Sequence, residues 1–246
     1  MPRFFTNNIS GSSALIVGED ARHIARSLRC RIGDELTLCD GNGRDYACRI
    51  TAIEEEQVTL EVLHSQLSKA EPPVALTLYQ ALPKGDKLDL IVQKAVELGV
   101  TAIVPVITRY CVSRPDEKSI EKKRERLQRI ALEAAKQSGR GIIPQVQPLM
   151  TYPEALAQMV RDECAILFYE DATHPLGSIL ATRPKSISML IGSEGGLSTE
   201  EAQAAKEAGL AVCTMGPRIL RCETAPMYAL SAITYHYENS EGFSHE

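Results

Sequence analysis

The sequence contains no tryptophan, and it also lacks most of the short motifs that commonly bring ligands to enzymes. A GxxxxGK(S/T) phosphate-binding loop is absent and no GxGxxG follows an expected strand, so the usual nucleotide-binding classes lose their main support. Neither CxxC nor HExxH occurs. The seven cysteines are therefore expected to be buried free thiols, and we expect no bound metal.

Long apolar runs are also missing: none reaches the roughly 18–20 residues that span a membrane. The first six residues, Met1–Thr6, lack the apolar core of a secretory signal peptide. With 44% hydrophobic and 24% charged residues, the 246-residue chain has the composition of a globular enzyme with one large domain, or one large and one small. We expect a cytoplasmic protein with reduced thiols.

Acidic residues exceed basic ones, 32 to 27, and the net charge of −5 argues weakly against a nucleic-acid partner. Two segments are nevertheless locally basic. Ten Lys and Arg accompany five Asp and Glu between Arg109 and Arg140, and four arginines and one histidine accompany a single aspartate between Asp20 and Arg31. Such patches set phosphate affinity. The alternative for the longer segment is a solvated helix surface with oppositely charged pairs, whereas the shorter one slightly favours RNA.

The first 70 residues predict a small β domain. Short runs with alternating or β-branched character are expected to form strands at Leu15–Val17, Glu35–Cys39, Tyr46–Ile53 and Val58–His64. Residues 40–43, Asp-Gly-Asn-Gly, are a hairpin turn signal, and 20–28 is the one helical stretch. Several short strands in so few residues indicate a small barrel. Pro72 and Pro73 break the pattern, which predicts one domain of residues 1–72 and a second of 73–246.

Beyond this boundary, strand and helix patterns alternate. Strands are expected at Val74–Leu78, Ala102–Ile107, Ile142–Val146, Ala165–Phe168, Ile187–Ile191 and Ala211–Met215. Helices are expected at Asp86–Leu98, Lys118–Ser138, Tyr152–Arg161, Leu176–Ala181 and Thr199–Ala208, with a last helix that ends near Tyr237. This alternation predicts an α/β domain whose mostly parallel sheet is covered by helices. The residues from Glu238 onward carry no pattern.

Two glycine-containing loops, Gly192–Ser198 and Gly216–Ala225, are the most informative segments. Each follows a short apolar run that is expected to be a buried parallel strand, and each runs into a helix. Ligands of open α/β sheets bind at the carboxyl ends of strands, so we expect the loops to share one pocket. Ser198 and Glu201 have the spacing of a capping box, which fixes the start of the first helix.

The loop sequences IGSEGGLSTEE and MGPRILRCETA resemble the signature loops of the RsmE family of ribosomal RNA methyltransferases, within the SPOUT superfamily. The segments PRFF, HIARSLRCRIGDELTLCDGNGRDY, QKAVELGVTAIVPVITRYCVSR and RIALEAAKQSGR resemble that family in matching order over nearly the whole chain. The resemblance implies a PUA-like β-barrel domain and a parallel-sheet domain with a deep trefoil knot at about residues 165–237. It also implies a homodimer that binds S-adenosylmethionine and methylates N3 of one uridine in 16S ribosomal RNA of the small ribosomal subunit.

Carried over residue by residue, the resemblance implies a cofactor pocket made of Leu167, Ile191, Gly192, Glu194, Gly195, Gly196, Met215, Gly216, Ile219, Leu220, Thr224 and Ala225. Methylation at N3 benefits from a base that removes the N3 proton and from a cation near the uracil oxygens. We expect Arg221 in the electrostatic role and either Glu194 or Glu223 as the base. Glu223 fits equally well a role in stabilising a helix N-terminus.

Basic residues expected to contact RNA are Arg3, Arg22, His23, Arg26, Arg29 and Arg31 in the first domain, with Arg109, Arg114 and Lys118 near the mouth of the active site. The alternative for His23 is a packing role in an amphipathic helix.

Two positions depart from the family pattern. Ser193 stands where proline is usual, and Pro226 stands where a small residue or threonine is common, in the first turn of a helix for which Thr224 is the expected N-cap. We expect these changes to alter affinity rather than to abolish activity. Two other functions stay open: a knotted methyltransferase that acts on a different RNA or on a ribose 2′-hydroxyl, and a non-catalytic RNA-binding factor in ribosome assembly.

Overall fold

The computed structural model describes residues 3–239, and the chain forms two compact units. The first comprises the residues up to Glu71 together with Ala135–Ile143, and the second comprises Pro72–Ala134 and the residues from Pro144 onward. The division after Glu71 lies one residue before the expected boundary. The sequence pattern gave no indication that a segment as distant as Ala135–Ile143 joins the first unit.

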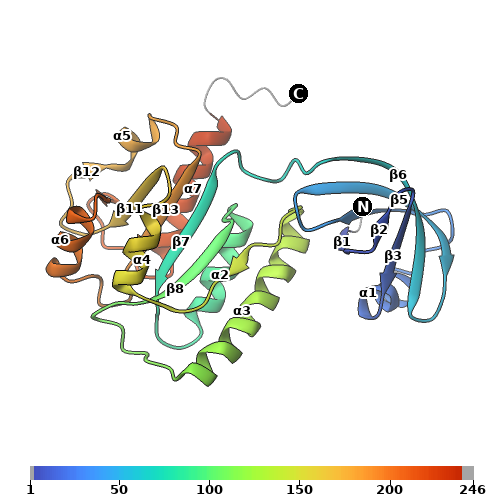
Figure 1. Ribbon diagram of the computed structural model, residues 1–246, viewed down its shortest axis with the longest axis horizontal. Helices are drawn as coiled ribbons and strands as arrows, with labels where there is room; N and C mark the ends of the chain where they lie inside the picture. Colours follow the sequence, from blue (N-terminus) through green and yellow to red (C-terminus); the bar gives the residue numbers. More distant parts are fainter. Residues whose placement is uncertain (1–2, 240–246) are drawn as a thin grey trace. The chain divides into compact units, whose positions relative to one another are not determined.

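The first unit is built on a six-stranded sheet in the order β1-β4-β5-β6-β3-β2 (Figure 1). Its strands are β1 (Arg3–Phe5), β2 (Ile9–Ser10), β3 (Ser13–Val17), β4 (Glu35–Cys39), β5 (Arg44–Ile53) and β6 (Gln57–Leu67). The β1–β4 pair is parallel and the others are antiparallel. The predicted hairpin turn joins β4 to β5, where Gly41 and Gly43 have positive φ angles of 76° and 91°.

The helical stretch of the first unit consists of α1 (Glu19–Arg22), which continues into a π-helical turn, η1 (His23–Ser27). It covers the sheet by burying Ala21 and Ile24. These two side chains pack in one core with residues such as Phe4, Leu38 and Leu60 from the strands. Complete burial of an aliphatic or aromatic side chain contributes about 1.5–3 kcal/mol, so this small core stabilises the unit as a whole.

The second unit contains an eight-stranded sheet in the order β10-β8-β7-β13-β11-β14-β12, and β9 also pairs with β8. The strands are β7 (Ala75–Ala81), β8 (Ala102–Ile107), β9 (Gln145–Val146), β10 (Met150–Thr151), β11 (Cys164–Phe168), β12 (His174–Pro175), β13 (Ser186–Ile191) and β14 (Ala211–Thr214). Every pairing among these described strands is parallel. The predicted α/β class with a parallel sheet is therefore confirmed.

The helices of the second unit are α2 (Lys87–Glu97), α3 (Glu117–Ser138, whose last turn belongs to the first unit), α4 (Tyr152–Met159), α5 (Leu176–Leu180), α6 (Thr199–Glu207) and α7 (Thr224–Asn239). α2 buries the apolar face that its periodicity defines, and Gly99, with φ 93°, follows its end. α7 begins at Thr224, one residue earlier than expected, with Pro226 in its first turn. Of the residues from Glu238 onward, Glu238 and Asn239 are helical, and 240–246 lie outside the described residues.

Strand order brings the two glycine loops together. β13 and β14 are the two neighbours of β11, and each runs directly into one of the loops. Because the three strands are parallel, their carboxyl ends lie at the same edge of the sheet. Within residues 3–239, no helix has both the length and the apolar character needed to cross a bilayer.

Candidate active site

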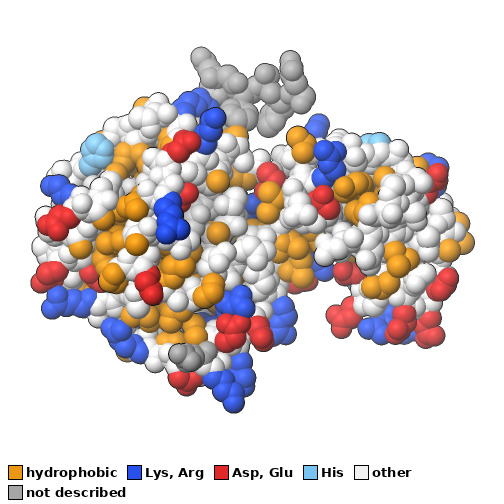
Figure 2. Space-filling model, viewed as in Figure 1, with side chains coloured by type: hydrophobic (Ala, Val, Ile, Leu, Met, Phe, Trp, Pro, Cys, Tyr) orange, Lys and Arg blue, Asp and Glu red, His pale blue; other side chains and the backbone are white. Residues whose placement is uncertain are grey.

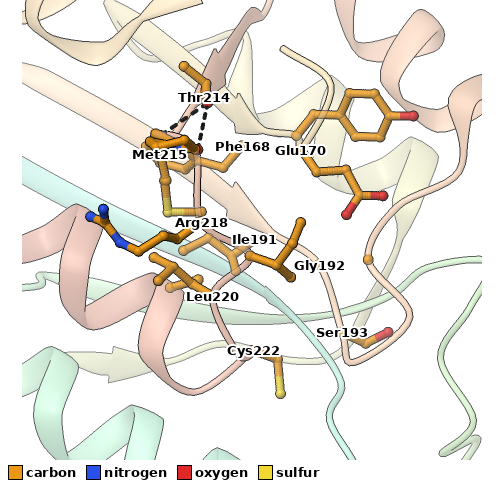
Figure 3. A pocket seen from close by; sticks show the side chains of 16 residues that line it. Phe168, Glu170, Ile191, Gly192, Ser193, Thr214, Met215, Arg218, Leu220 and Cys222 are labelled. Carbon is orange, nitrogen blue, oxygen red and sulfur yellow. Dashed lines mark hydrogen bonds between the residues drawn. The ribbon is translucent and has the colours of Figure 1, made fainter. Parts of the chain in front are cut away.

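The glycine loops border a cavity of about 170 Å³ at the ends of β11, β13 and β14. Its walls are mainly apolar and include Phe168, Ile191, Leu220 and Ala225. Figure 3 shows Ile191, Gly192 and Leu220 close together at its centre, with Glu170 above and Cys222 below. The turn 214–220 also lines the cavity. The cavity suits a flat, largely apolar ligand group that is held at its edges by peptide groups.

The first loop is compact because two of its glycines have no room for a side chain. A Cβ on Gly192 would lie 2.8 Å from the carbonyl carbon of Gly196, and a Cβ on Gly195 would lie 2.8 Å from Cβ of Tyr110. The loop closes on itself where the Gly196 N–H donates to the Ser193 carbonyl at 2.9 Å. Only glycine permits this close approach of backbone to backbone.

The departure at Ser193 has a visible consequence. Its side chain is buried, and its hydroxyl has no hydrogen-bond partner among the described residues. Nearby, the amide nitrogen of Gln80 donates to the Gly192 carbonyl at 3.3 Å, while the Gln80 side-chain oxygen is likewise unpaired. Ser193 lines both cavities, so its hydroxyl lies beside the space that a bound ligand would occupy.

A capping box ends the loop, as predicted. The Ser198 hydroxyl accepts a hydrogen bond from the Glu201 N–H at 3.2 Å, and the Glu201 carboxylate accepts one from the Ser198 N–H at 2.9 Å. The second oxygen of Glu201 accepts from the Arg109 N–H at 2.7 Å. One carboxylate therefore ties the first glycine loop to the loop after β8, which carries Tyr110.

A second cavity, of about 430 Å³, adjoins the first and shares with it Glu170, Ser193, Gly196, Ile219, Leu220 and Cys222. The second cavity is richer in charged side chains: Lys87, Glu170, Glu194 and Arg221 line it, whereas Glu170 and Arg218 are the charged residues of the first. An apolar chamber and a charged chamber therefore share one wall at the ends of the parallel strands.

Lys87, at the first position of α2, connects both loops through its ammonium group. Its Nζ lies 3.0 Å from Oε1 of Glu194 in the first loop and 3.4 Å from Oε2 of Glu223 in the second. The Lys84 N–H donates to Glu194 at 3.1 Å. The Cys222 thiol donates to Glu223 at 3.2 Å and lies 3.8 Å from Nζ of Lys87. The two candidate bases are thus part of one cluster.

The cluster favours the charged forms of both carboxyl groups. Burial alone would raise the pKa of Glu194, but hydrogen bonds from Lys87 and from backbone N–H groups outweigh it and lower the pKa below its usual value. The Cys222 thiol, backbone N–H groups and Lys87 together lower the pKa of Glu223. Burial raises the pKa of Cys222 to about 12, so its thiol stays neutral and available as a donor.

Most of the residues implied for the cofactor pocket line these cavities. Ile191, Gly192, Gly196, Met215, Gly216, Ile219, Leu220 and Ala225 line the apolar one, and Glu194 and Gly195 line the charged one. Leu167 and Thr224 line neither: Leu167 is fully buried in the core, and Thr224 begins α7. Of the expected catalytic residues, Arg221 and Glu194 line the charged cavity. Glu223 lines neither cavity and contacts Lys87.

The residues of the two cavities that were not among the predicted site residues include Lys87, Phe168, Tyr169, Glu170, Thr214, Pro217, Arg218 and Cys222. Phe168, Tyr169 and Glu170 stand at the carboxyl end of β11, and the rule that ligands bind at strand ends was a sufficient signal for them. Lys87 precedes the loops by more than a hundred residues, and nothing in its local sequence marks it.

The basic residues expected to contact RNA fall into two groups. Some are paired with carboxylates: Arg3 with Asp45 at 2.8 Å, Arg22 with Glu56 at 2.9 Å, Arg26 with Glu55 at 3.3 Å and Arg109 with Glu200 at 3.0 Å. Arg29, Arg31, Arg114 and Lys118 are exposed and have no carboxylate partner among the described residues. The His23 ring packs edge-on against Phe4, with ring centroids 6.1 Å apart. Figure 2 shows basic and acidic side chains interspersed on the viewed face.

Comparison with known proteins agrees with this geometry. A family model described as an RNA methyltransferase domain matches residues 70–234, and one described as an RNA methyltransferase PUA domain matches residues 16–63. Together with the parallel sheet and its paired glycine loops, these matches define an RNA methyltransferase with an N-terminal PUA-like domain.

The similarity extends along nearly the whole chain. Ribosomal RNA small subunit methyltransferase E from Bacillus subtilis is 36% identical over 92% of this chain and 91% of its own length, and the Mycobacterium bovis protein of that name is 32% identical over 91% and 87%. The chain belongs to the ribosomal RNA small subunit methyltransferase E family.

Solved structures show the same relationship. The crystal structure of ribosomal RNA small subunit methyltransferase E from Neisseria gonorrhoeae bound to S-adenosylmethionine has a TM-score of 0.85 and 35% identity, and the alignment covers 95% of this chain and 96% of that one. A Legionella pneumophila protein solved with the bound cofactor has a TM-score of 0.82 and 27% identity over 94% and 96% of the two chains.

Proposed function

We propose that this protein, as a ribosomal RNA methyltransferase of its family, transfers the methyl group of S-adenosylmethionine to N3 of one uridine in 16S ribosomal RNA. The observation that carries the proposal is the pair of adjoining cavities at the glycine loops, one apolar and one lined by Lys87, Glu194 and Arg221. The first suits a cofactor, and the second suits the proton transfer that methylation at N3 requires.

The residues present fit the cofactor. Gly192 and Gly195 let the first loop pack tightly against Gly196 and Tyr110, so that the loop borders both cavities, and Phe168, Ile191 and Leu220 provide the apolar walls that an adenine ring needs. Glu170 lines both cavities and is placed to meet a positively charged ligand group. When bound, S-adenosylmethionine supplies an electrophilic methyl carbon on a sulfonium centre.

The chain's own residues act on the uridine. Uracil N3 carries a proton and becomes a good nucleophile only when that proton leaves. The proton passes from N3 to a carboxylate oxygen, which leaves an electron pair on N3 available for the methyl carbon that S-adenosylmethionine would supply. Arg221, exposed at the rim of the charged cavity, stabilises the negative charge that spreads onto the uracil oxygens.

Exposed basic side chains contribute to RNA binding in this proposal. Arg29, Arg31, Arg114 and Lys118 contact backbone phosphates, and Arg22, Arg26 and Arg109 exchange exposed carboxylate partners for phosphate. Arg3 is excluded from this set because its guanidinium makes a two-pronged contact with the buried Asp45.

The finer architecture is also proposed. Residues 73–246, apart from the segment Ala135–Ile143 that joins the first unit, form the SPOUT domain, with a trefoil knot at about 165–237. Strand order supports the knot: β13 inserts between β7 and β11, and β14 inserts between β11 and β12. A homodimer is supported by family membership and by α7, which exposes Tyr228 and Tyr235 on one face. Its ribosomal substrate assigns the protein to the cytoplasm.

The test is methyl transfer from labelled S-adenosylmethionine to unmodified small ribosomal subunits and to free 16S RNA, followed by mass spectrometry of the nucleosides. Label in N3-methyluridine at one position supports the proposal, and the preferred form of the RNA identifies the substrate state. Label on a ribose or on another base contradicts the N3 assignment. Cofactor binding without any transfer contradicts the proposed rRNA substrate.

A further inference from the structure

Lys87 is the one cation in the described structure that contacts both candidate bases, and it comes from neither glycine loop. Its 3.0 Å contact with Glu194 and 3.4 Å contact with Glu223 place a single ammonium between two carboxylates. At this separation, opposite charges favour each other's ionised forms, and removal of the cation would leave two like charges side by side.

The two carboxylates differ in what they face. Glu194 lines the charged cavity, whereas Glu223 does not. Glu223, in the second loop, accepts a hydrogen bond from the Cys222 thiol and contacts Lys87. A base must reach its proton directly or through one water. Of these two groups, Glu194 meets that geometric requirement, and Glu223 is placed to anchor the lysine.

Resting on the function proposed above, we propose that Lys87 is the positioning residue of the methyl-transfer site. Anchored by Glu223, its ammonium orients Glu194 and keeps it ionised as the acceptor of the uridine N3 proton. Each loop thus contributes one carboxylate, and α2 contributes the cation that contacts both and fixes their relative position. The N3 proton, once on Glu194, is released to solvent after the product leaves.

Other charged groups face the same cluster. Glu170 from the segment after β11 and Arg221 from the second loop line the cavity with Lys87 and Glu194, and the Lys84 N–H holds the Glu194 carboxylate from the segment before α2. Glu170 is a further carboxylate at the same cavity and offers Glu194 no cation. Arg221 is exposed and forms no ion pair with Glu194 among the described residues, so that it does not replace Lys87.

The matched control lies on the same helix. Lys94 pairs with Glu97 at 2.8 Å, and its side chain is 38% exposed, the same fraction as that of Lys87. Lys87→Met, Lys87→Arg and Lys94→Met would be compared with the unchanged protein in two measurements. The first is a carboxyl ¹³C NMR titration of the free protein, with Glu194→Gln and Glu223→Gln to assign the signals. The second is the pH profile of single-turnover methyl transfer.

In Lys87→Met we expect the pKa of Glu194 to rise by about one pH unit. Because a carboxylate base works only when ionised, the acidic limb of the rate profile should move to higher pH by the same amount, and activity should recover as pH increases. In Lys87→Arg the pKa of Glu194 should stay mostly low. In Lys94→Met both the Glu194 titration curve and the pH–rate profile should coincide with those of the unchanged protein. Glu194→Gln should remove transfer, and Glu223→Gln should give a smaller shift than Lys87→Met.

An unchanged Glu194 titration in Lys87→Met would overturn the proposal, as would a rate that falls equally at every pH, since both are what a merely structural lysine would give. The NMR titration needs no substrate. A shifted titration in a protein that methylates no ribosomal RNA would therefore contradict the proposed reaction while leaving the Lys87–Glu194 coupling established.

Discussion

At the scale of the single residue, Arg221 differs from Lys87 and Arg109 beside the loops, and it shares its lack of a carboxylate partner among the described residues with Arg218 of the same loop. Lys87 and Arg109 are paired with carboxylates, whereas no carboxylate in the described part of the chain binds the exposed guanidinium of Arg221. A cation without a protein partner is free to meet charge that appears on the substrate. Its position on the rim of the charged cavity fits a role in the transition state.

For Arg221→Ala we therefore predict a loss of about 100-fold in the rate of methyl transfer, the size of effect seen when one donor to a developing oxyanion is removed. The dissociation constant of the cofactor should change little, since the apolar cavity does not include Arg221. Single-turnover kinetics and isothermal titration calorimetry measure the two quantities. Arg221→Lys, which keeps the charge, should be impaired less, and near-normal turnover in the alanine variant would remove Arg221 from the mechanism.

Gly192 supports a second residue-scale prediction. In Gly192→Ala the new methyl group would lie 2.8 Å from the backbone of Gly196, which no side-chain rotation can relieve. Overpacking of this kind costs about 1–3 kcal/mol, and the loop can escape it only by opening. We expect cofactor affinity to fall by about tenfold or more.

The control is Gly177→Ala in α5, where the added methyl group meets no atom within 4 Å and the φ angle is not positive. Calorimetric titration of the cofactor against both variants is the measurement. Equal affinities in the two variants would show that the close contact between Gly192 and Gly196 does not shape the pocket.

At the scale of the element, α6 joins two loops through its first turn. Glu201 accepts hydrogen bonds from the Ser198 and Arg109 N–H groups, and its own carbonyl accepts one from the Tyr152 hydroxyl at 2.6 Å. The N-terminus of the helix is thus fixed to β8 and α4 as well as to the glycine loop. The position of Tyr110 over Gly195 depends on this junction.

We predict that Ser198→Ala lowers the free energy of unfolding by about 1 kcal/mol, as the loss of an N-cap does. Glu201→Ala should cost about 2–3 kcal/mol because it also leaves a partly buried N–H without an acceptor. The Thr151→Ala change in the capping box of α4 is the control: it should cost about as much as Ser198→Ala. Amide hydrogen exchange distinguishes the three variants, because only Glu201→Ala should expose the Arg109 N–H to solvent. Continued protection of that amide in Glu201→Ala would show that Glu201 does not hold the loop after β8.

How far the elements could be predicted depended on their length. Strands with four or more residues in a clear pattern, such as β4 and β8, lie where the sequence indicated, within three residues at each end. β1, β2, β10 and β12 have two or three residues, too few to show a period, and they were missed. The loops were predictable because glycine and capping residues act locally. Lys87 was not, because its role exists only after distant strands pair.

At the scale of the whole molecule, the chain passes between its two units three times, after Glu71, Ala134 and Ile143. The periodic pattern of α3 continues across the second of these points, so no local sequence signal marks the point where the chain returns to the first unit. Within the first unit, the returning segment is held by backbone contacts. The Gly43 N–H donates to the Gly141 carbonyl at 3.2 Å, and Ile142 forms bridges with Gly41 and Asn42 of the hairpin turn.

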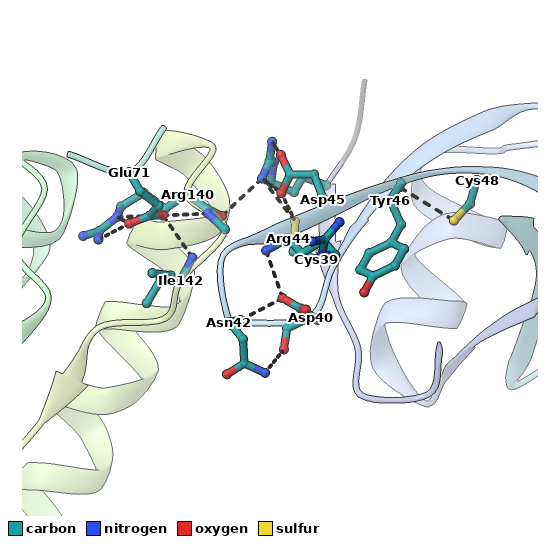
Figure 4. A network of polar contacts seen from close by, with 12 residues as sticks. Cys39, Asp40, Asn42, Arg44, Asp45, Tyr46, Cys48, Glu71, Arg140 and Ile142 are labelled. Carbon is teal, nitrogen blue, oxygen red and sulfur yellow. Dashed lines mark hydrogen bonds and ion pairs between the residues drawn. The ribbon is translucent and has the colours of Figure 1, made fainter. Parts of the chain in front are cut away.

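A buried ion pair completes this attachment (Figure 4). Arg140 is only 2% exposed, and its guanidinium binds the Glu71 carboxylate at 2.6 Å. Glu71 also accepts the N–H groups of Gly141 and Ile142 at 2.8 and 3.0 Å, and the Arg140 carbonyl accepts a hydrogen bond from Arg3. Glu71, the last residue of the first stretch of this unit, is thereby joined to Ala135–Ile143, the segment that returns to the unit.

For Arg140→Met we predict a loss of about 3–5 kcal/mol in the stability of the first unit, because the change leaves the Glu71 carboxylate partly buried without its cation. Glu71→Gln in the Arg140→Met background should recover part of this loss, since glutamine removes the unpaired charge and keeps an oxygen for the Gly141 N–H. Arg124→Met, which breaks an exposed pair with Glu121 on the same helix, should change stability little. Native-state amide exchange in β4 and β5 measures the first unit, with β7 and β13 as the internal reference. Equal destabilisation of both units, or no recovery in the double variant, would show that the buried pair does not anchor the returning segment.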